Sequence, residues 1–256
     1  MDMIDIPLLF SAGLVIGFLG TIVGVGGGFI VVPLLTMGYH FSPQYAVGTS
    51  MVIVALNALS GTSSYIRQGR IDYQTGILFA VPTIPGSFFG AYLLQFISRR
   101  QFDFGFGLLL IFIAAYLCVQ ISTSNEHIEG AVLPRPAYNK PLGIGISFFV
   151  GFLASMAGIG GGVIHVPAMI YLFGFSPFIA IPTSHFILAF SATLAAMSHA
   201  FIGEVQWGYI PFLGVGVVLG AQIGGNISHK IHSNWIIRIL SVIIGMVAVR
   251  FLLKSF

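Results

Sequence analysis

The chain has 256 residues, of which 57% are hydrophobic and only 7% are charged, whereas soluble domains carry about 25% charged residues. This composition excludes a soluble domain and indicates an integral membrane protein. The formal net charge of +3 comes from scattered loop residues, so nucleic-acid binding has no support. Cys118 is the single cysteine, which excludes an internal disulfide and a cysteine-based metal site.

Apolar runs separated by loops with charges or turn residues predict an all-α, polytopic membrane protein. No charged residue occurs from Ile6 to Ile66 or from Pro141 to Gly203, and each run is long enough for two or three crossings of about 20 residues. These runs are apolar on every face, which argues against the alternating strands of a membrane barrel. We expect a split segment at 8–38 with helices at 43–66, 73–97 and 103–121, then a split segment at 141–173 with helices at 177–201, 207–228 and 234–254.

The second set of elements repeats the first at a constant offset of 134 residues. GFLGTIVGVGGGFIVVP, from Gly17 to Pro33, returns as GFLASMAGIGGGVIHVP, from Gly151 to Pro167, with 10 of 17 positions identical. We therefore predict two homologous transmembrane repeats, at 1–121 and 141–256, joined by a polar linker at 122–140.

Each repeat opens with an apolar segment that a run of glycines interrupts. A helix does not run comfortably through such glycines, because each costs about 1 kcal/mol relative to alanine. Flanking pieces of about ten residues, such as Gly13–Val23 and Phe29–Gly38, would each cover half of a bilayer core and place the break near mid-membrane. Non-helical backbone at that depth must be buried in protein or line a cavity, and a helix that starts there directs free N–H groups at an anion. Close helix packing is the alternative role of such glycines. The glycines expected to bind substrate are Gly26, Gly27, Gly28, Gly160, Gly161 and Gly162.

Hydroxyl pairs recur at the same place in each repeat. Thr49-Ser50 and Thr183-Ser184 follow their helix starts by seven or eight residues, about 10 to 12 Å into the membrane and level with the breaks. Gly48 precedes one pair and Pro182 the other, so we expect both helices to loosen there. Hydroxyls that bond to their own helix carbonyls are the alternative.

Two histidines depart from the repeat, since His165 and His185 replace Val31 and Met51. Polar groups at membrane depth usually face the bundle interior and are often functional. A histidine could donate a hydrogen bond to an anion or exchange a proton during coupling, or it could simply be satisfied by a neighbouring helix. Asn57 is a further expected binding residue, and His199, Gln222 and Asn226 are weaker candidates of the same kind.

Acidic residues are absent from every apolar run. The carboxylate relay of many proton-driven carriers is therefore missing. A cationic substrate would need a buried carboxylate to balance its charge, so this absence argues against a cation. No catalytic arrangement is supported by spacing either, so we expect no enzyme, no cofactor and no metal site.

The orientation of the repeats is open between two arrangements. If each split segment dips in and returns, the halves are inverted; if it crosses, they are parallel. Arginines and lysines are distributed on both faces, so the positive-inside rule does not decide. We prefer the inverted arrangement, which is common in transporters.

The duplicated GxGGG motif with its following proline, the GTS and PTSH segments at Gly48 and Pro182, and the loop from Arg67 to Asp72 resemble the TauE/SafE family of sulfite exporters and sulfonate permeases. The resemblance covers both halves. It implies a multi-pass transporter of the cell inner membrane for sulfite, sulfoacetate or another organosulfonate. It leaves the substrate, the direction and the coupling ion open.

We therefore expect a secondary carrier, most simply an exporter, that binds a small sulfur oxyanion or sulfonate between the two halves. The protein is expected to lie in the lipid bilayer, and protons are the candidate coupling ion. A homodimer is possible, and the oligomeric state is left open. An anion channel of the same architecture is the first alternative, and an intramembrane enzyme, or a structural partner of one, is the second.

Overall fold

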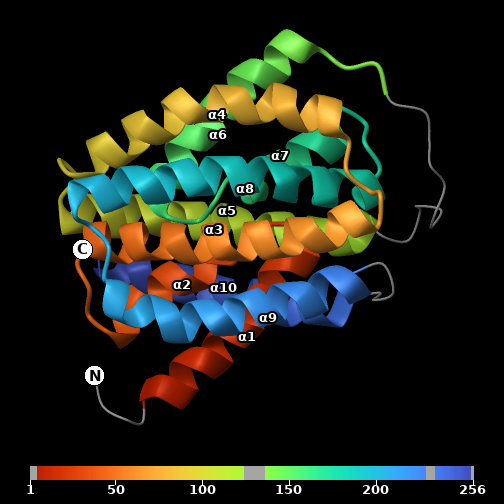
Figure 1. Cartoon of the computed structure of the whole chain (residues 1–256). Helices are drawn as coiled ribbons and strands as arrows, with labels where there is room; N and C mark the ends of the chain where they lie inside the picture. The colour runs from red at the N-terminus through yellow and green to blue at the C-terminus, as the bar shows by residue number, and fades with distance from the viewer. Residues whose placement is uncertain (1–4, 124–135, 229–233, 255–256) are drawn as a thin grey trace. The chain divides into compact units, whose positions relative to one another are not determined.

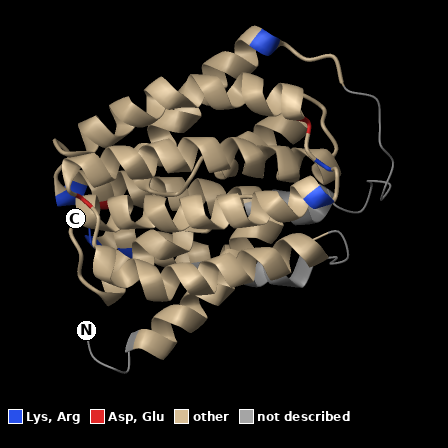
Figure 2. Cartoon of the chain, viewed as in Figure 1, with Lys and Arg blue, Asp and Glu red and all other residues tan. Residues whose placement is uncertain are grey.

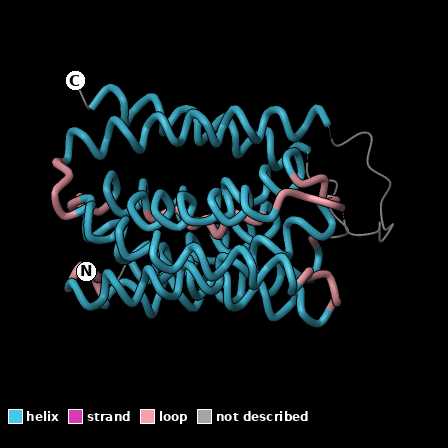
Figure 3. Tube along the Cα trace, turned by 90° about the horizontal axis from the view of Figure 1, so that it is seen from above, coloured by secondary structure: helices cyan, strands magenta, loops and turns pink. Residues whose placement is uncertain are grey.

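The computed structural model describes residues 5–123, 136–228 and 234–254, and over these ranges it is built from helices and loops without strands (Figure 3). Most of the predicted linker, at 124–135, lies outside the described residues. Six of the described helices are long and apolar enough to cross a bilayer. The all-α prediction is therefore confirmed, and the chain is a multi-pass membrane protein.

The elements follow the predicted order closely (Figure 1). The first series is α1 (Asp5–Val23), α2 (Gly28–Pro33), η1 (Leu34–Gly38), α3 (Pro43–Arg67), α4 (Tyr73–Leu94) and α5 (Arg99–Thr123). The second series is α6 (Lys140–Ala157), α7 (Gly162–Pro167), η2 (Ala168–Leu172), α8 (Pro177–Ile202), η3 (Trp207–Tyr209), α9 (Ile210–Ile227) and α10 (Asn234–Lys254).

Among the described residues, the charged ones lie near the two ends of the long helices and not along their middle (Figure 2). The loops also lie at these ends, except for the breaks between α1 and α2 and between α6 and α7 (Figure 3). This distribution is expected of helices that run through hydrocarbon, where an unpaired charge costs several kcal/mol.

The chain forms two compact units. The first unit contains Met1–Gln95 and Pro134–His229, so it takes elements from both predicted repeats. The second unit contains Phe96–Leu133 and Lys230–Phe256. In the second unit α5 packs against α10, where the rings of Phe106 and Phe251 lie 5.0 Å apart.

Helices of the two repeats pair with each other in the first unit. α3 lies beside α8, α1 beside α9, and α4 beside α6 (Figure 1). α3 and α8 are antiparallel, because the loop after each one reaches the first part of the other: the Asp72 N–H donates to Thr183, and the Gln206 N–H donates to Thr49.

Small residues allow the paired helices to approach closely. A Cβ atom at Gly17 would overlap the backbone of Val217, and one at its repeat counterpart Gly151 would overlap the carbonyl oxygen of Thr83. Such contacts are typical of membrane helices, which gain van der Waals packing when their backbones approach. The packing role considered for glycines thus applies to the helix pairs α1/α9 and α4/α6.

Candidate functional site

Both predicted helix breaks are present. Residues 24–27 separate α1 from α2, and residues 158–161 separate α6 from α7. In the first break Gly24, Gly26 and Gly27 have φ angles of 79°, 85° and 81°, and in the second Gly158 and Gly160 have 71° and 76°. This left-handed conformation is strained for residues with a Cβ atom, which explains why glycine occupies these positions.

The first helix of each repeat is longer than the sequence suggested. α1 has 19 residues and α6 has 18, so the expectation of about ten residues before the break is wrong. After the break the chain folds back along the helix it has just left. The N–H groups of Val25 and Gly26 donate to the carbonyl oxygen of Gly20, and a Cβ atom at Gly27 would meet Ile16.

The two breaks meet inside the first unit. A Cβ atom at Gly28 would overlap the carbonyl oxygen of Gly158, and one at Gly162 would overlap that of Gly24. All four glycines are buried. The contact is reciprocal, since Gly28 and Gly162, and likewise Gly24 and Gly158, are counterparts in the two repeats.

Two apolar side chains fill the space beside this junction. Val54 of α3 and Leu188 of α8 each approach both Gly26 and Gly160. Val54 is central in the 25-residue helix α3, and Leu188 is central in the 26-residue helix α8. The junction is therefore level with the middle of the two long central helices.

Backbone N–H groups at both breaks are candidate donors. In the described part of the chain, the backbone hydrogen bonds formed outside the helices include none from the N–H groups of Gly27, Gly28, Gly160, Gly161 or Gly162. N–H groups without a helical acceptor are usual in the first turn of a helix, and these belong to buried residues.

Asn57 stabilises the first break from α3. Its amide nitrogen donates to the carbonyl oxygen of Gly26 at 2.8 Å, and its amide oxygen accepts from Thr21 at 2.7 Å. Its counterpart in the second repeat is Ser191, whose hydroxyl group bonds to its own helix at Leu188. Asn57 thus holds the loop in this conformation, and the sequence had suggested it only as a binding residue.

The two counterpart serines differ in their partners. Ser50 donates to the carbonyl oxygen of Gly158 at 2.6 Å and so ties α3 to the second break. The hydroxyl group of Ser184, which is fully buried, has no hydrogen-bond partner. A buried hydroxyl without a partner costs about 1 to 3 kcal/mol, and a ligand oxygen could satisfy it.

The threonines of the two pairs hold the loops that follow α3 and α8. Thr49 accepts from the N–H of Gln206 at 3.0 Å, and Thr183 accepts from the N–H of Asp72 at 2.9 Å. Both helices continue past these residues, so neither is broken there. Pro182 has no N–H group, and the carbonyl oxygen of Phe178, four residues earlier, accepts a hydrogen bond from Arg70. Gly48 makes room for the backbone of the loop after α8.

His185 is fully buried and packs against α3. Its ring meets the ring of Tyr65 edge-on at 5.7 Å, and its Nε2 atom faces Gly61. Neither ring nitrogen makes a hydrogen bond, although the backbone of Asn57 lies beside the ring. His185 and Ser184 are therefore adjacent, fully buried residues whose side-chain polar atoms are unpaired.

His165 has a different environment. Its Nε2 atom lies 3.1 Å from the hydroxyl group of Ser147, and its ring is nearly parallel to that of Phe79 at 6.3 Å. The two histidines therefore contact different side chains, His165 those of Ser147 and Phe79 and His185 that of Tyr65.

The chain matches the family described as sulfite exporter TauE/SafE over residues 9–251. The chain belongs to the TauE/SafE family. It is therefore a membrane transporter of the TauE/SafE type, and the resemblance noted in the sequence is confirmed.

Similar proteins from bacteria and archaea cover nearly the whole TauE/SafE chain. The probable membrane transporter protein YunE of Bacillus subtilis is 33% identical over 258 residues, with 94% of each chain covered. The probable membrane transporter protein MJ0441 of Methanocaldococcus jannaschii is 26% identical, with 97% of this chain and 96% of that one covered. No solved structure matches the chain.

Two charged residues of this TauE/SafE protein, Glu204 and Arg70, are buried just beyond helix ends. Glu204 follows α8 and contacts His199, and Arg70 follows α3 and contacts Tyr65. Burial lowers the pKa of the Arg70 guanidinium, and Tyr65 opposes this shift. The signal was present in the repeat, because Tyr65 and Arg70 are the counterparts of His199 and Glu204.

The glycines at the junction are buried in this TauE/SafE conformation. Two apolar hollows of about 390 and 460 Å³ lie along α6 and along α1 with α9, and neither includes a residue of the breaks or a Thr-Ser pair. Among the described residues no group of three histidine, cysteine or acidic side chains is placed to hold a metal ion. Access to the buried donors therefore requires a movement of the protein.

Proposed function

We propose that this protein is a secondary carrier that exports a small sulfur oxyanion or sulfonate, and that the anion binds where the two breaks meet. The observation that carries the proposal is the pair of unpaired buried polar residues, Ser184 and His185, in a chain whose glycine breaks touch each other. The N–H groups of Gly27, Gly28 and Gly160–Gly162 are further candidate donors. The name of the family supplies the substrate class and the direction.

The chemistry of these buried donors suits an anion. Hydroxyl, imidazole and backbone N–H groups all donate hydrogen bonds, and a sulfonate or sulfite offers several acceptor oxygens. No carboxylate lies within the described central parts of α3 or α8, so a cation would find no partner there. Donors without a buried negative charge therefore favour an anionic substrate.

The closed junction favours a carrier over a channel. Val54 and Leu188 occupy the space between Gly26 and Gly160, and they must part before an anion can enter. We propose that the two repeats are inverted and that their relative movement exposes the junction to one side of the membrane at a time. A channel would need a continuous open path instead.

Ligand binding to purified protein tests the substrate class. Sulfite, sulfoacetate, taurine and sulfate are added separately, and the thermal unfolding midpoint is measured in detergent. A ligand present at 100 times its Kd should stabilise the folded state by about 2.7 kcal/mol. If none of the sulfur oxyanions or sulfonates raises the midpoint, the substrate assignment is wrong.

The variant Ser184→Ala tests the place of binding. It removes a hydroxyl group that has no protein partner, so we expect about tenfold weaker ligand binding and little loss of stability. Ser198→Ala is the matched control, because that hydroxyl lies on the same helix and bonds to the carbonyl oxygen of Leu194. Equal affinities in the two variants would contradict binding at Ser184. Counterflow of labelled substrate in liposomes then separates a carrier from a channel.

A further inference from the structure

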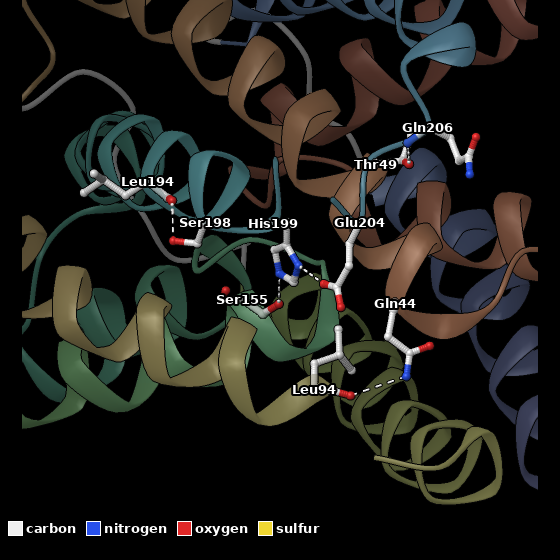
Figure 4. Close-up of polar contacts among 9 residues, drawn as sticks. All are labelled: Gln44, Thr49, Leu94, Ser155, Leu194, Ser198, His199, Glu204 and Gln206. Carbon is white, nitrogen blue, oxygen red and sulfur yellow. Dashed lines mark hydrogen bonds and ion pairs between the residues drawn. The ribbon is translucent and has the colours of Figure 1, made fainter. Parts of the chain in front are cut away.

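A histidine and a glutamate form a buried contact at the end of α8. The Nδ1 atom of His199 lies 2.7 Å from the carboxylate of Glu204, and its Nε2 atom lies 3.2 Å from the carbonyl oxygen of Ser155 (Figure 4). The His199 side chain is fully buried, and the Glu204 side chain is 10% exposed. The ring thus connects a slightly exposed carboxylate to α6.

The turn after α8 places Glu204 beside His199. Gly203 has a φ angle of 87°, and the N–H of Glu204 donates to the carbonyl oxygen of His199 at 2.9 Å. A glycine at this point is common in helix C-terminal caps. Gly69 repeats the geometry after α3, with a φ angle of 65° and an N–H of Arg70 that donates to the carbonyl oxygen of Tyr65.

The two contacts of His199 require a shared proton. A carbonyl oxygen only accepts hydrogen bonds, so Nε2 must carry a hydrogen toward Ser155. The short distance between Nδ1 and Glu204 then needs a second proton, either on an imidazolium that faces a carboxylate or on a carboxylic acid that faces a neutral ring. Both arrangements contain one proton that the deprotonated pair lacks.

Loss of that proton must break one of the two contacts. If the remaining ring hydrogen stays on Nε2, lone pairs on Nδ1 and on Glu204 face each other. If it moves to Nδ1, a lone pair on Nε2 faces the carbonyl oxygen of Ser155. The burial of the ring makes either arrangement costly, because an unpaired buried polar group loses its solvation.

No other charged group in the described contacts compensates this change. From α6 the pair meets the Ser155 carbonyl group, and from α3 it meets the backbone of Gly48. Across the described residues no further ion pair involves His199 or Glu204. The protonation of this pair is therefore decided between its own two side chains and the solvent that reaches Glu204.

In the first repeat, the residue that corresponds to His199 makes the corresponding hydrogen bond without an additional proton. Tyr65 donates to the carbonyl oxygen of Thr21 at 2.8 Å, and Thr21 is the counterpart of Ser155. The guanidinium of Arg70 lies 5.5 Å from the Tyr65 ring, where the repeat would place Glu204. A phenol makes this bond while neutral, so the contact is retained across the pH range in which histidine titrates.

We infer that His199 and Glu204 form the proton-binding site that couples transport, and that they hold the second break only while the shared proton is bound. Ser155 lies three residues before Gly158, where α6 ends at the junction. Release of the proton frees this end of α6, whereas Tyr65 keeps the first break fixed. The inference rests on the proposed carrier function for its role in transport, and it assigns coupling to His199 rather than to His185.

The variant Glu204→Gln tests the site directly. A glutamine can donate to Nδ1 at every pH, so it imitates the protonated pair. In detergent without substrate, we expect the unfolding midpoint of the wild-type protein to fall as rising pH removes the shared proton, and that of Glu204→Gln to stay level. His40→Asn is the control, because it removes an exposed histidine and keeps a residue suited to its φ of 56°; it should behave as the wild type does.

Transport supplies the second measurement, with labelled sulfoacetate as the probe. One coupled proton changes the steady-state accumulation by about tenfold per unit of pH gradient. We expect Glu204→Gln to keep sulfoacetate exchange at zero gradient and to lose this response. The double variant His199→Tyr/Glu204→Arg copies the first repeat, so it should give the same result if Glu204→Gln folds poorly.

Different failures have different meanings. A wild-type protein that neither binds nor exchanges any sulfonate overturns the proposed substrate, while the unfolding measurement still tests the pair. A wild-type midpoint that does not change with pH, or a Glu204→Gln midpoint that changes as the wild type does, overturns the proton site. Retention of the gradient response in Glu204→Gln overturns the coupling role.

Discussion

Asn57 shows how one side chain can fix a backbone that has no regular structure. The first break exposes the carbonyl oxygen of Gly26 inside the protein, and Asn57 supplies its donor while it accepts a hydrogen bond from Thr21. A buried polar network of this kind is stabilising only when its members are satisfied. The amide therefore determines the shape of the break.

Replacement of this amide should destabilise the protein without a change of charge. Asn57→Ala leaves the Gly26 carbonyl group and the Thr21 hydroxyl group unpaired, so we expect a loss of about 2 to 4 kcal/mol. The unfolding midpoint in detergent measures it. Thr193→Ala is the control, since that hydroxyl bonds to its own helix at Ala189; equal midpoints in the two variants would contradict the role given to Asn57.

Residue types could be predicted from the sequence better than residue partners. Polar residues at membrane depth indicated Ser184, His185 and Asn57, and the structure buries all three. Their contacts join residues distant in sequence, such as Thr21 and Asn57. The local sequence pattern therefore could not show that the Asn57 amide is hydrogen-bonded within the protein and that the Ser184 hydroxyl group is not. Glu204 was missed because it lies outside every apolar run and reaches His199 only through the turn at Gly203.

At the scale of elements, helix ends could be predicted within a few residues where charge, proline or glycine marks them. The predicted helix at 43–66 is observed as Pro43–Arg67, and that at 177–201 as Pro177–Ile202. The end of α1 at Val23 is also where the predicted piece Gly13–Val23 ends, because the glycines of the break follow it. The start of α1, at Asp5 rather than Gly13, was not predicted.

The contact between the two breaks gives a prediction about α2. Gly28→Ala places a methyl group on the carbonyl oxygen of Gly158, and neither atom belongs to a flexible side chain. We expect this variant to lose monodisperse behaviour in detergent or to unfold at a markedly lower temperature.

Gly145→Ala is the control for this prediction. Gly145 lies exposed in α6, and a Cβ atom there would meet nothing within 4 Å. Alanine is the better helix former by about 1 kcal/mol, so Gly145→Ala should be as stable as the wild type or more so. A Gly28→Ala protein with wild-type stability would show that the breaks are not in contact.

At the scale of the molecule, the repeat predicts which elements correspond but not how they pack. The offset of 134 residues relates α1 to α6 and α4 to α9. The structure pairs α1 with α9 and α4 with α6, so each repeat completes the other within the first unit. Packing of this kind depends on contacts across long stretches of sequence, which periodicity does not encode. The division into repeats at 1–121 and 141–256 stays a prediction about the sequence.

The central proposal is that substrate passes between the two breaks, where Val54 and Leu188 now meet the same glycines. The most direct test introduces Val54→Cys and Leu188→Cys together with Cys118→Ser, which removes the one native thiol. Exchange of labelled sulfoacetate is measured in liposomes before and after treatment with a short bis-methanethiosulfonate, which joins two thiols through disulfide bonds that a reductant cleaves. We predict that cross-linking reduces exchange to the level of empty liposomes and that a reductant restores it, whereas each single-cysteine variant is unaffected. Undiminished exchange by fully cross-linked protein would contradict a path through the junction.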